Sequence, residues 1–258
     1  MMILRQKSVA YLIALFCSPF LIVGYLCDPF AGKPLEHSQD IEISQGQVAN
    51  EPSPKEQLPY VVDKTLPELL VANKSTLLDR EYEPSDLRSV NGVYLRDMAA
   101  TALTKMLEDA EKKGIDGLVV YSGYRSYHTQ AAVYDNKIAS LRSEYGDKAK
   151  MMAEQLVAPP GASEHQTGLA VDFTIQKFLH KKYVLNYDFA DTIQGQWLRN
   201  NAWKYGYILR YDESKEDITQ ISYEPWHFRY VGVEHATRMY ERNLCLEEYV
   251  GPPIIEKK

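Results

Sequence analysis

The sequence predicts an α+β fold in which a small, mostly antiparallel sheet is flanked by helices. Segments with helical periodicity and short β-branched runs alternate irregularly over residues 58–250, unlike the regular strand–helix repeat of a doubly wound fold. Hydrophobic residues make up 45% and charged residues 25% of the 258 residues, an ordinary globular mixture that can form a sizeable core. The formal net charge of -6 argues against a nucleic-acid-binding protein, which would need clustered Lys and Arg.

The N-terminal segment 1–27 differs from the rest of the chain. Ser8–Cys27 holds no charged residue, and Arg5 and Lys7 precede it. A run of about 20 apolar residues can span a membrane, and positive charges before it favour a cytoplasmic N-terminus. The alternative is a cleaved signal peptide, although no small-residue cleavage site is evident after the run. We expect residues 1–27 to be a membrane anchor or signal segment and the rest to lie outside the cytoplasm.

Residues 28–57 resemble a flexible tether, since four prolines stand among Gly, Ser, Gln and Glu without any apolar period. The globular domain is expected over 58–250, with a short C-terminal tail at 251–258. Cys245 is the single cysteine after the apolar segment, so neither an intrachain disulfide nor a thiolate metal site is expected there. A metal ion would have to be held by histidines and carboxylates.

The first half of the domain begins with a helix at 96–113, where apolar residues recur at helical spacing and Gly114 follows. The β-branched run GLVVY at 117–121 predicts a buried strand, which Ser122-Gly123 ends. A second helix is expected from Tyr127 through Arg142, and a third continues through Gln155.

The second half starts with an irregular connection at Pro159-Pro160-Gly161. AVDFTI at 170–175 is a strand candidate, and residues 191–205 have helical character with Trp197, Leu198 and Trp203 available for the core. Two further strands and a last helix are expected at 208–211, 226–231 and 234–247.

The segment SEHQTGLAVD contains two candidate metal ligands, His165 and Asp172. They are seven residues apart, and Gly168 between them allows a turn that brings both to one ion. Zinc accepts such mixed nitrogen and oxygen ligands. Taken alone, this spacing is more often a turn-capping histidine and an ordinary carboxylate at a strand end.

The segment EPWH supplies a third candidate ligand and a candidate catalytic base. His227 is a third candidate ligand, and a catalytic zinc site has three protein ligands and a position for water. Glu224 stands three residues earlier and can serve as the base that takes the proton from that water. Together the two segments favour a zinc site over a surface carboxylate beside a core Trp-His pair.

Arg125 in the segment SGYRSYHTQ follows a predicted strand and a glycine break, so it can project from a loop into a cleft. Its guanidinium can bind the free carboxylate of a peptide through two parallel hydrogen bonds. It can also stabilise a tetrahedral oxyanion, or make only a surface ion pair.

Together the three segments resemble the VanY-type D-alanyl-D-alanine carboxypeptidases, zinc peptidases of the hedgehog/DD-peptidase fold. The patterns SGYRSxxxQ, SxHxxGxAxD and ExWH occur here in order, and the resemblance covers about Leu58 to Val250. It implies one zinc ion held by His165, Asp172 and His227, with Glu224 as catalytic base. It further implies that Arg125, with Gln130 and Ser163, holds the substrate.

The resemblance implies hydrolysis of the terminal D-Ala from peptidoglycan stem peptides. An L,D-carboxypeptidase acting on tetrapeptide stems is the alternative, because related enzymes share the same three motifs. A non-catalytic wall-binding module on the same fold is a third possibility, which the intact Glu224 disfavours. The expected partners are stem peptides and, through the N-terminal segment, the membrane; the oligomeric state is not predicted.

Overall fold

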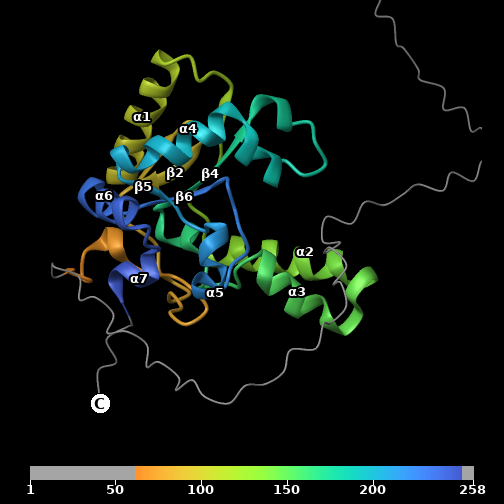
Figure 1. The fold of residues 1–258 in the computed structure, drawn as a ribbon. Coiled ribbons are helices and arrows are strands. Elements are labelled where there is room, and N and C mark those ends of the chain that lie inside the picture. Colours follow the sequence, from red (N-terminus) through yellow and green to blue (C-terminus); the bar gives the residue numbers. More distant parts are fainter. Residues whose placement is uncertain (1–61, 252–258) are drawn as a thin grey trace, which may run out of the picture. The chain divides into compact units, whose positions relative to one another are not determined.

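The computed structural model describes residues 62–251 (Figure 1). The predicted anchor at 1–27, the tether at 28–57 and all but the first residue of the C-terminal tail lie outside the described residues. Between residues 62 and 251, no helix is both long and apolar enough to cross a membrane.

A four-stranded antiparallel sheet lies at the centre of the domain. Its spatial order is β3-β4-β6-β5, and every neighbouring pair runs antiparallel. All four strands were expected from the sequence; the bounds of β4 agree with the prediction, and those of the other three differ by one or two residues. The four strands are β3 (Leu118–Ser122), β4 (Ala170–Ile175), β5 (Tyr207–Leu209) and β6 (His227–Tyr230).

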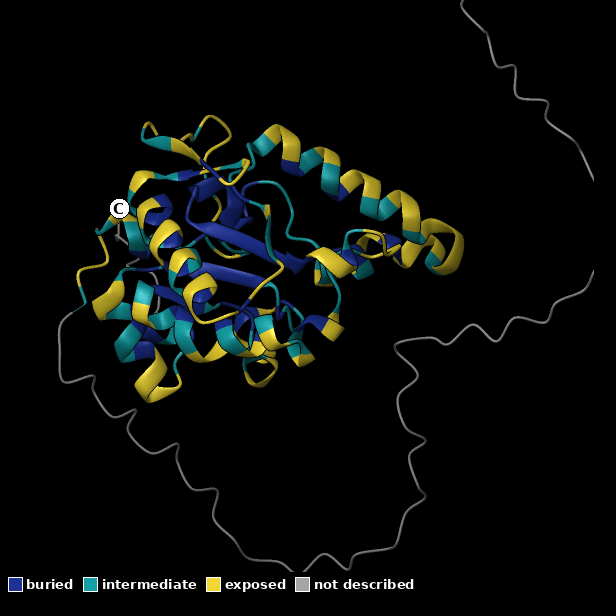
Figure 2. Ribbon diagram, turned by 90° about the horizontal axis from the view of Figure 1, so that it is seen from above, coloured by how far each residue is buried: buried dark blue, intermediate teal, exposed yellow. Residues whose placement is uncertain are grey.

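Helices surround the sheet and confirm the α+β prediction. In Figure 2 the buried strands lie in the middle, and the helices carry the exposed surface. The α2 and α3 helices pack against each other and project to one side of the sheet (Figure 1). The α-helices are α1 (Asp97–Lys112), α2 (Tyr127–Tyr145), α3 (Ala149–Leu156), α4 (Ile193–Asn201), α5 (Glu216–Thr219), α6 (Val233–Arg242) and α7 (Leu246–Val250).

The two faces of the sheet have different environments, because strand residues alternate between them. On β4, Val171, Phe173 and Ile175 point into the main hydrophobic core, which also contains residues of α1 and α4. Asp172 and Thr174 are buried on the opposite face. The functional side chains therefore gather on the polar face of a sheet whose other face is fixed by apolar packing.

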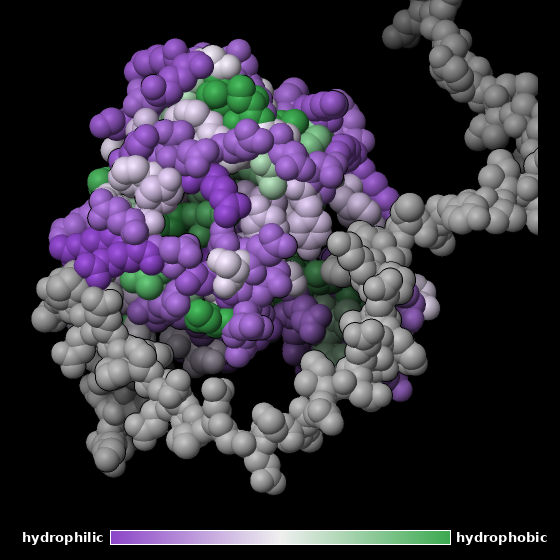
Figure 3. All heavy atoms as spheres, in the orientation of Figure 1, coloured by the Kyte–Doolittle hydropathy of each residue, from purple (hydrophilic) through white to green (hydrophobic). Residues whose placement is uncertain are grey.

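The surface of the domain is mostly hydrophilic on the side shown in Figure 3, where apolar residues form small separate patches. Large exposed hydrophobic side chains, such as Leu77, Met151 and Ile193, are likewise scattered over the chain. Single exposed hydrophobic residues are common on protein surfaces and need no binding partner to explain them.

A β-hairpin before α1 was missed by the sequence prediction. Its strands are β1 (Leu87–Val90) and β2 (Val93–Arg96), and Val90 pairs with Val93 across a two-residue turn. Asn91 and Gly92 both have positive φ, 46° and 86°, as a type I′ turn requires. An Asn-Gly pair between apolar runs is the signal that would have identified it.

The last predicted helix, 234–247, is divided into α6 and α7. Asn243 adopts the left-handed conformation with φ 50° and ends α6. Cys245 then starts α7, where its side chain and that of Glu248 form a capping box. The predicted helix at 191–205 similarly becomes α4 followed by a 3-10 helix at Ala202–Tyr205.

Candidate metal centre and active site

The sheet register places two of the predicted ligands directly opposite each other. In the antiparallel pair β4–β6, Asp172 pairs with His227, so both side chains point to the same face. Their separation is 2.9 Å between His227 Nδ1 and Asp172 Oδ1. Cross-strand pairing thus brings together residues that are 55 positions apart in the chain.

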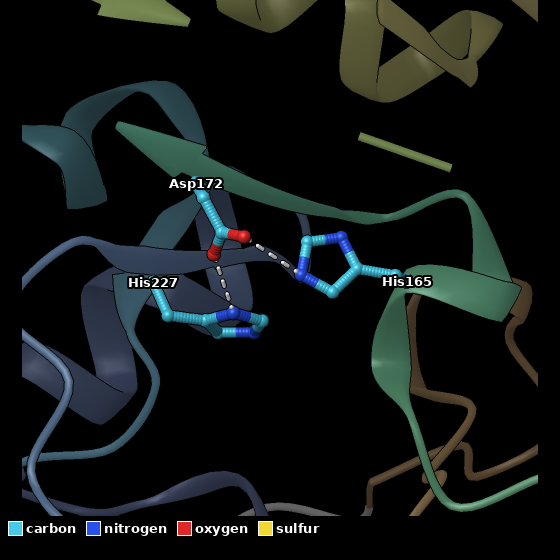
Figure 4. A group of neighbouring side chains, drawn as sticks. All are labelled: His165, Asp172 and His227. Carbon is cyan, nitrogen blue, oxygen red and sulfur yellow. Dashed lines mark hydrogen bonds and ion pairs between the residues drawn. The ribbon is translucent and has the colours of Figure 1, made fainter. Parts of the chain in front are cut away.

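The third predicted ligand, His165, lies in a turn that precedes β4. His165 lies in a 3-10 helix at Glu164–Thr167, which ends at Gly168 in the left-handed conformation with φ 69°. This turn reverses the chain into β4 and leaves His165 Nε2 3.1 Å from Asp172 Oδ2 (Figure 4). The ligand atoms of His165, Asp172 and His227 all lie within 4.8 Å of one another.

The hydrogen bonds of His165 indicate that a cation fits between these groups. Its Nδ1 lies 2.7 Å from the carbonyl oxygen of Gly123, which can only accept, so Nδ1 carries the proton. Burial, helped by the positive charge of Arg125, lowers the pKa of His165 and so favours the neutral ring. Its Nε2 lone pair then faces a carboxylate oxygen, an arrangement that a shared metal ion makes favourable.

The His227 ring is surrounded by carboxylates and by the ring of Tyr211. Its pKa reflects opposing effects: burial lowers it, but the carboxylates of Asp172, Glu164 and Glu224 outweigh burial and raise it to about 9. The ring of Tyr211 packs against that of His227 with centroids 4.9 Å apart. A metal ion would replace the proton on Nδ1, because a histidine ligand must be neutral at the coordinating nitrogen.

Glu224 lies beside this cluster, as expected for the base. Its Oε2 is 3.8 Å from His227 Nδ1, and its side chain is 18% exposed. Backbone hydrogen bonds from Glu224 N to Tyr211 O and from His227 N to Glu224 O fix the short link. Burial raises the pKa of Glu224 to about 7, and a bound divalent cation would lower it again.

Arg125 also reaches the cluster. Its NH2 is 3.9 Å from Asp172 Oδ2, and its backbone N–H donates to the carbonyl oxygen of His165. The side chain remains 21% exposed. The guanidinium therefore stands at the edge of the candidate metal centre with a side open to substrate.

Gln130 and Ser163 are placed differently. Gln130 is buried on α2, and its Nε2 donates to the carbonyl oxygen of Ala158 at 2.6 Å, so it braces the connection that follows α3. Ser163 is buried immediately before the turn of His165, and its side chain makes no capping hydrogen bond to that turn. Both lie in the segments expected, while their contact with substrate stays a prediction.

The family model for VanY, D-alanyl-D-alanine carboxypeptidase, matches residues 92–233, which include the whole cluster. The chain belongs to this family. Among curated relatives it is 42% identical over 191 residues to YodJ of Bacillus subtilis, which is named as a carboxypeptidase. It is 35% identical over 191 residues to a D-alanyl-D-alanine carboxypeptidase of Enterococcus faecalis. These matches cover 70% and 71% of this chain but only 66% and 65% of the relatives.

Solved structures of VanY-family enzymes share the fold. One is the LD-carboxypeptidase LdcB, with a TM-score of 0.61 and 42% identity, covering 71% of this chain and 86% of LdcB. Another is a vancomycin resistance D,D-pentapeptidase VanY in complex with Zn(II), with a TM-score of 0.62 and 34% identity. That match covers 72% of this chain and 100% of the other. The fold prediction, a hedgehog/DD-peptidase-like α+β domain, is confirmed.

One buried acidic residue in this VanY-family site escaped the sequence prediction. Glu164, next to His165, is almost completely buried and contacts two buried arginines, Arg210 and Arg229. The available signal was the arginines themselves, because an arginine within a buried strand needs a buried acid to compensate its charge.

Proposed function

We propose that this protein is a zinc-dependent D-alanyl-D-alanine carboxypeptidase that removes the terminal D-Ala from peptidoglycan stem peptides. The observation that carries the proposal is the convergence of His165, Asp172 and His227 within 4.8 Å, with Glu224 beside them. A structure of a VanY enzyme with Zn(II) supports the choice of metal, as does the ligand set of two histidines and one carboxylate.

The ligand set fits a zinc ion in a catalytic site. Three protein ligands leave a fourth position for water or substrate. The Nε2 of His165 lies 3.1 Å from Asp172 Oδ2, and the Nδ1 of His227 lies 2.9 Å from Asp172 Oδ1, so two ring nitrogens converge on one carboxylate. When bound, zinc would supply Lewis-acid chemistry, polarising the scissile carbonyl and making water more acidic.

Glu224 supplies the proton transfers. Its carboxylate takes a proton from the attacking water, and the same group then donates it to the leaving amine. Hydrogen bonds of the adjacent backbone fix the short link between Glu224 and His227. The reaction therefore requires no nucleophilic side chain and no covalent intermediate on the protein.

Arg125 selects the end of the peptide. A carboxypeptidase must recognise a free carboxylate, and a guanidinium fork does so through paired hydrogen bonds. Arg125 is partly open to solvent and lies 3.9 Å from a ligand carboxylate, so a bound terminus would stand within reach of the metal centre. Gln130 and Ser163 are proposed to orient the substrate amide.

An L,D-carboxypeptidase acting on tetrapeptide stems is the second candidate. It is favoured by one observation, the 42% identity to LdcB, which exceeds the 34% identity to the VanY structure. Either activity would be carried out on the wall side of the membrane. The proposed tethering rests on residues 1–27, whose apolar run is the supporting observation.

The test is mass spectrometry of synthetic muropeptides incubated with the zinc-loaded full chain, with and without a chelator. Chelator-sensitive loss of one alanine from pentapeptide would support the D,D proposal. Loss of alanine from tetrapeptide alone would replace it with the L,D activity. Zinc binding without cleavage of either peptide would contradict both and indicate a wall-binding module.

A further inference from the structure

A buried charge network lies behind the candidate metal centre, on the polar face of the sheet. Glu164 Oε1 accepts hydrogen bonds from Arg210 Nε at 2.8 Å and from Arg229 NH1 at 2.9 Å. The other two guanidinium nitrogens of Arg210 donate hydrogen bonds to the carboxylate of Glu247. Two arginines thus balance two glutamates, and the side chains of Arg210, Arg229 and Glu164 are fully buried.

The strand geometry explains why this network reaches a metal ligand. His227 and Arg229 are two positions apart on β6, so they share one face. Arg210 follows β5 and donates its backbone N–H to the carbonyl oxygen of His227. The turn that carries His165 places its neighbour Glu164 against all three of these side chains.

The second oxygen of Glu164 faces the ring of His227. Glu164 Oε2 lies 3.7 Å from His227 Nε2, which is longer than a formed hydrogen bond and short enough for a strong charge contact in a buried site. Both atoms are completely buried, and neither has a hydrogen-bond partner within the described part of the chain. A carboxylate oxygen opposite a ring nitrogen favours a proton on that nitrogen.

We infer that Glu164 is a positioning residue that holds the proton of His227 on Nε2 and thereby presents Nδ1 to the metal ion. The inference rests on the proposed function, because it assigns a role toward the zinc site. Histidine ligands generally donate their other ring N–H to an acceptor, which fixes the tautomer and increases the ligand's basicity. Gly123 O accepts this hydrogen bond from His165, and Glu164 Oε2, 3.7 Å from Nε2, is the acceptor that faces His227.

The two arginines ensure that Glu164 can only accept a hydrogen bond from His227 and cannot donate one to it. Two fully buried guanidinium groups, those of Arg210 and Arg229, contact Glu164 and require the negative charge of a carboxylate at this position. The group therefore stays a carboxylate, with Oε1 committed to the arginines and Oε2 left for the ring. A protonated acid or an amide at this position could donate to Nε2 and so move the ring proton to Nδ1.

Glu164→Gln tests this directly. The two guanidinium groups accept no hydrogen bonds, so the amide oxygen stays toward them and the NH2 group faces His227 Nε2. That orientation favours the wrong tautomer, and zinc affinity measured by competition with a chelator should fall about 10- to 100-fold. The matched control is Glu247→Gln, which removes the same charge from the other side of Arg210 without touching His227.

Glu247→Gln should lower the stability of the domain and leave the zinc affinity unchanged. An equal loss of zinc affinity in both variants would overturn the inference, because the network would then act only through stability. So would an unchanged affinity in Glu164→Gln.

Nitrogen NMR of the zinc-loaded wild-type chain decides the matter even if a variant does not fold. The expected spectrum has the His227 proton on Nε2 and a metal-shifted Nδ1. A proton on Nδ1 with zinc bound elsewhere on the ring would overturn the role of Glu164 while leaving the proposed function intact. Absence of zinc binding by the wild-type chain would instead overturn the proposed function and this inference with it.

Discussion

Gly168→Ala should cost more stability than a glycine substitution with the same backbone conformation elsewhere. Gly168 turns the chain between His165 and Asp172 with φ +69°, where an L-residue costs about 1–2 kcal/mol. A Cβ built there lies 2.9 Å from Leu87 Cδ2 and 3.0 Å from Arg96 Cγ. Gly114, after α1, has φ +72° with nothing within 4 Å of its Cβ, so Gly114→Ala measures the backbone cost alone.

The difference between the two variants comes from the contacts. Leu87 Cδ2 is the end of a flexible side chain and can move at little cost. Arg96 cannot move as easily, because its backbone N–H donates to Gly168 O at 2.8 Å and its Nε is bonded to Asp86. Overpacking of this kind costs about 1–3 kcal/mol, which is the excess destabilisation expected for Gly168→Ala over Gly114→Ala.

The assay is urea unfolding of both variants with a chelator present, followed by zinc competition on the folded proteins. The entropy that Ala removes from the unfolded chain is the same in both and cancels. Gly168→Ala should also weaken zinc binding, since the turn carries His165 toward Asp172, whereas Gly114→Ala should not. Equal loss of stability in the two variants would refute the packing of the turn against the β1–β2 hairpin.

Three further predictions concern the chemistry of the site. Glu224→Gln should retain zinc by elemental analysis yet reduce kcat about 100- to 10,000-fold, since the general base is lost; near-wild-type turnover would remove Glu224 from the mechanism. Arg125→Lys should raise KM for pentapeptide more than it lowers kcat, because the ammonium cannot make the bidentate contact, and equal effects on an amidated substrate would argue against carboxylate recognition. Zinc affinity should fall as the pH is lowered below about 9, because His227 is then protonated without metal and must release that proton to bind it; a pH-independent affinity from pH 6 to 9 would contradict this.

Local patterns in the sequence were sufficient to predict the main sheet and to select the three residues that the structure brings together as a candidate metal centre. GLVVY and AVDFTI became β3 and β4 because β-branched and aromatic residues pack well on a pleated surface. His165, Asp172 and His227 were identified by their spacing and residue type, and the structure brings them together. Pairing of Asp172 with His227 across β4 and β6 depends on register, which the sequence does not specify locally.

The elements that escaped prediction are those whose local signal was ambiguous. The strand Val93–Arg96 runs directly into α1, and its last residue, Arg96, was assigned to the start of the predicted helix, although Asn91-Gly92 marked a turn. The break between α6 and α7 depends on the left-handed conformation of Asn243, which competes with a helical pattern on either side. Residues with positive φ decide both cases, Asn91 and Gly92 in the hairpin and Asn243 between the two helices.

One face of the sheet carries the apolar packing that stabilises the domain, and the other face carries the candidate metal centre. Phe173 and Phe228 pack edge to face in the main core with ring centroids 5.6 Å apart, while their chain neighbours Asp172 and His227 lie in the candidate metal centre on the other face. Because adjacent residues serve opposite faces, a shift of either strand by one position would exchange the ligands for core residues. The buried arginine–glutamate network lies on the same face as the ligands, beside a second apolar cluster that includes Ile208, the residue paired with Arg229 across β5 and β6. We attribute its cost in desolvation to what it does for the ligands. The apolar face sets the register, and that register places the ligands.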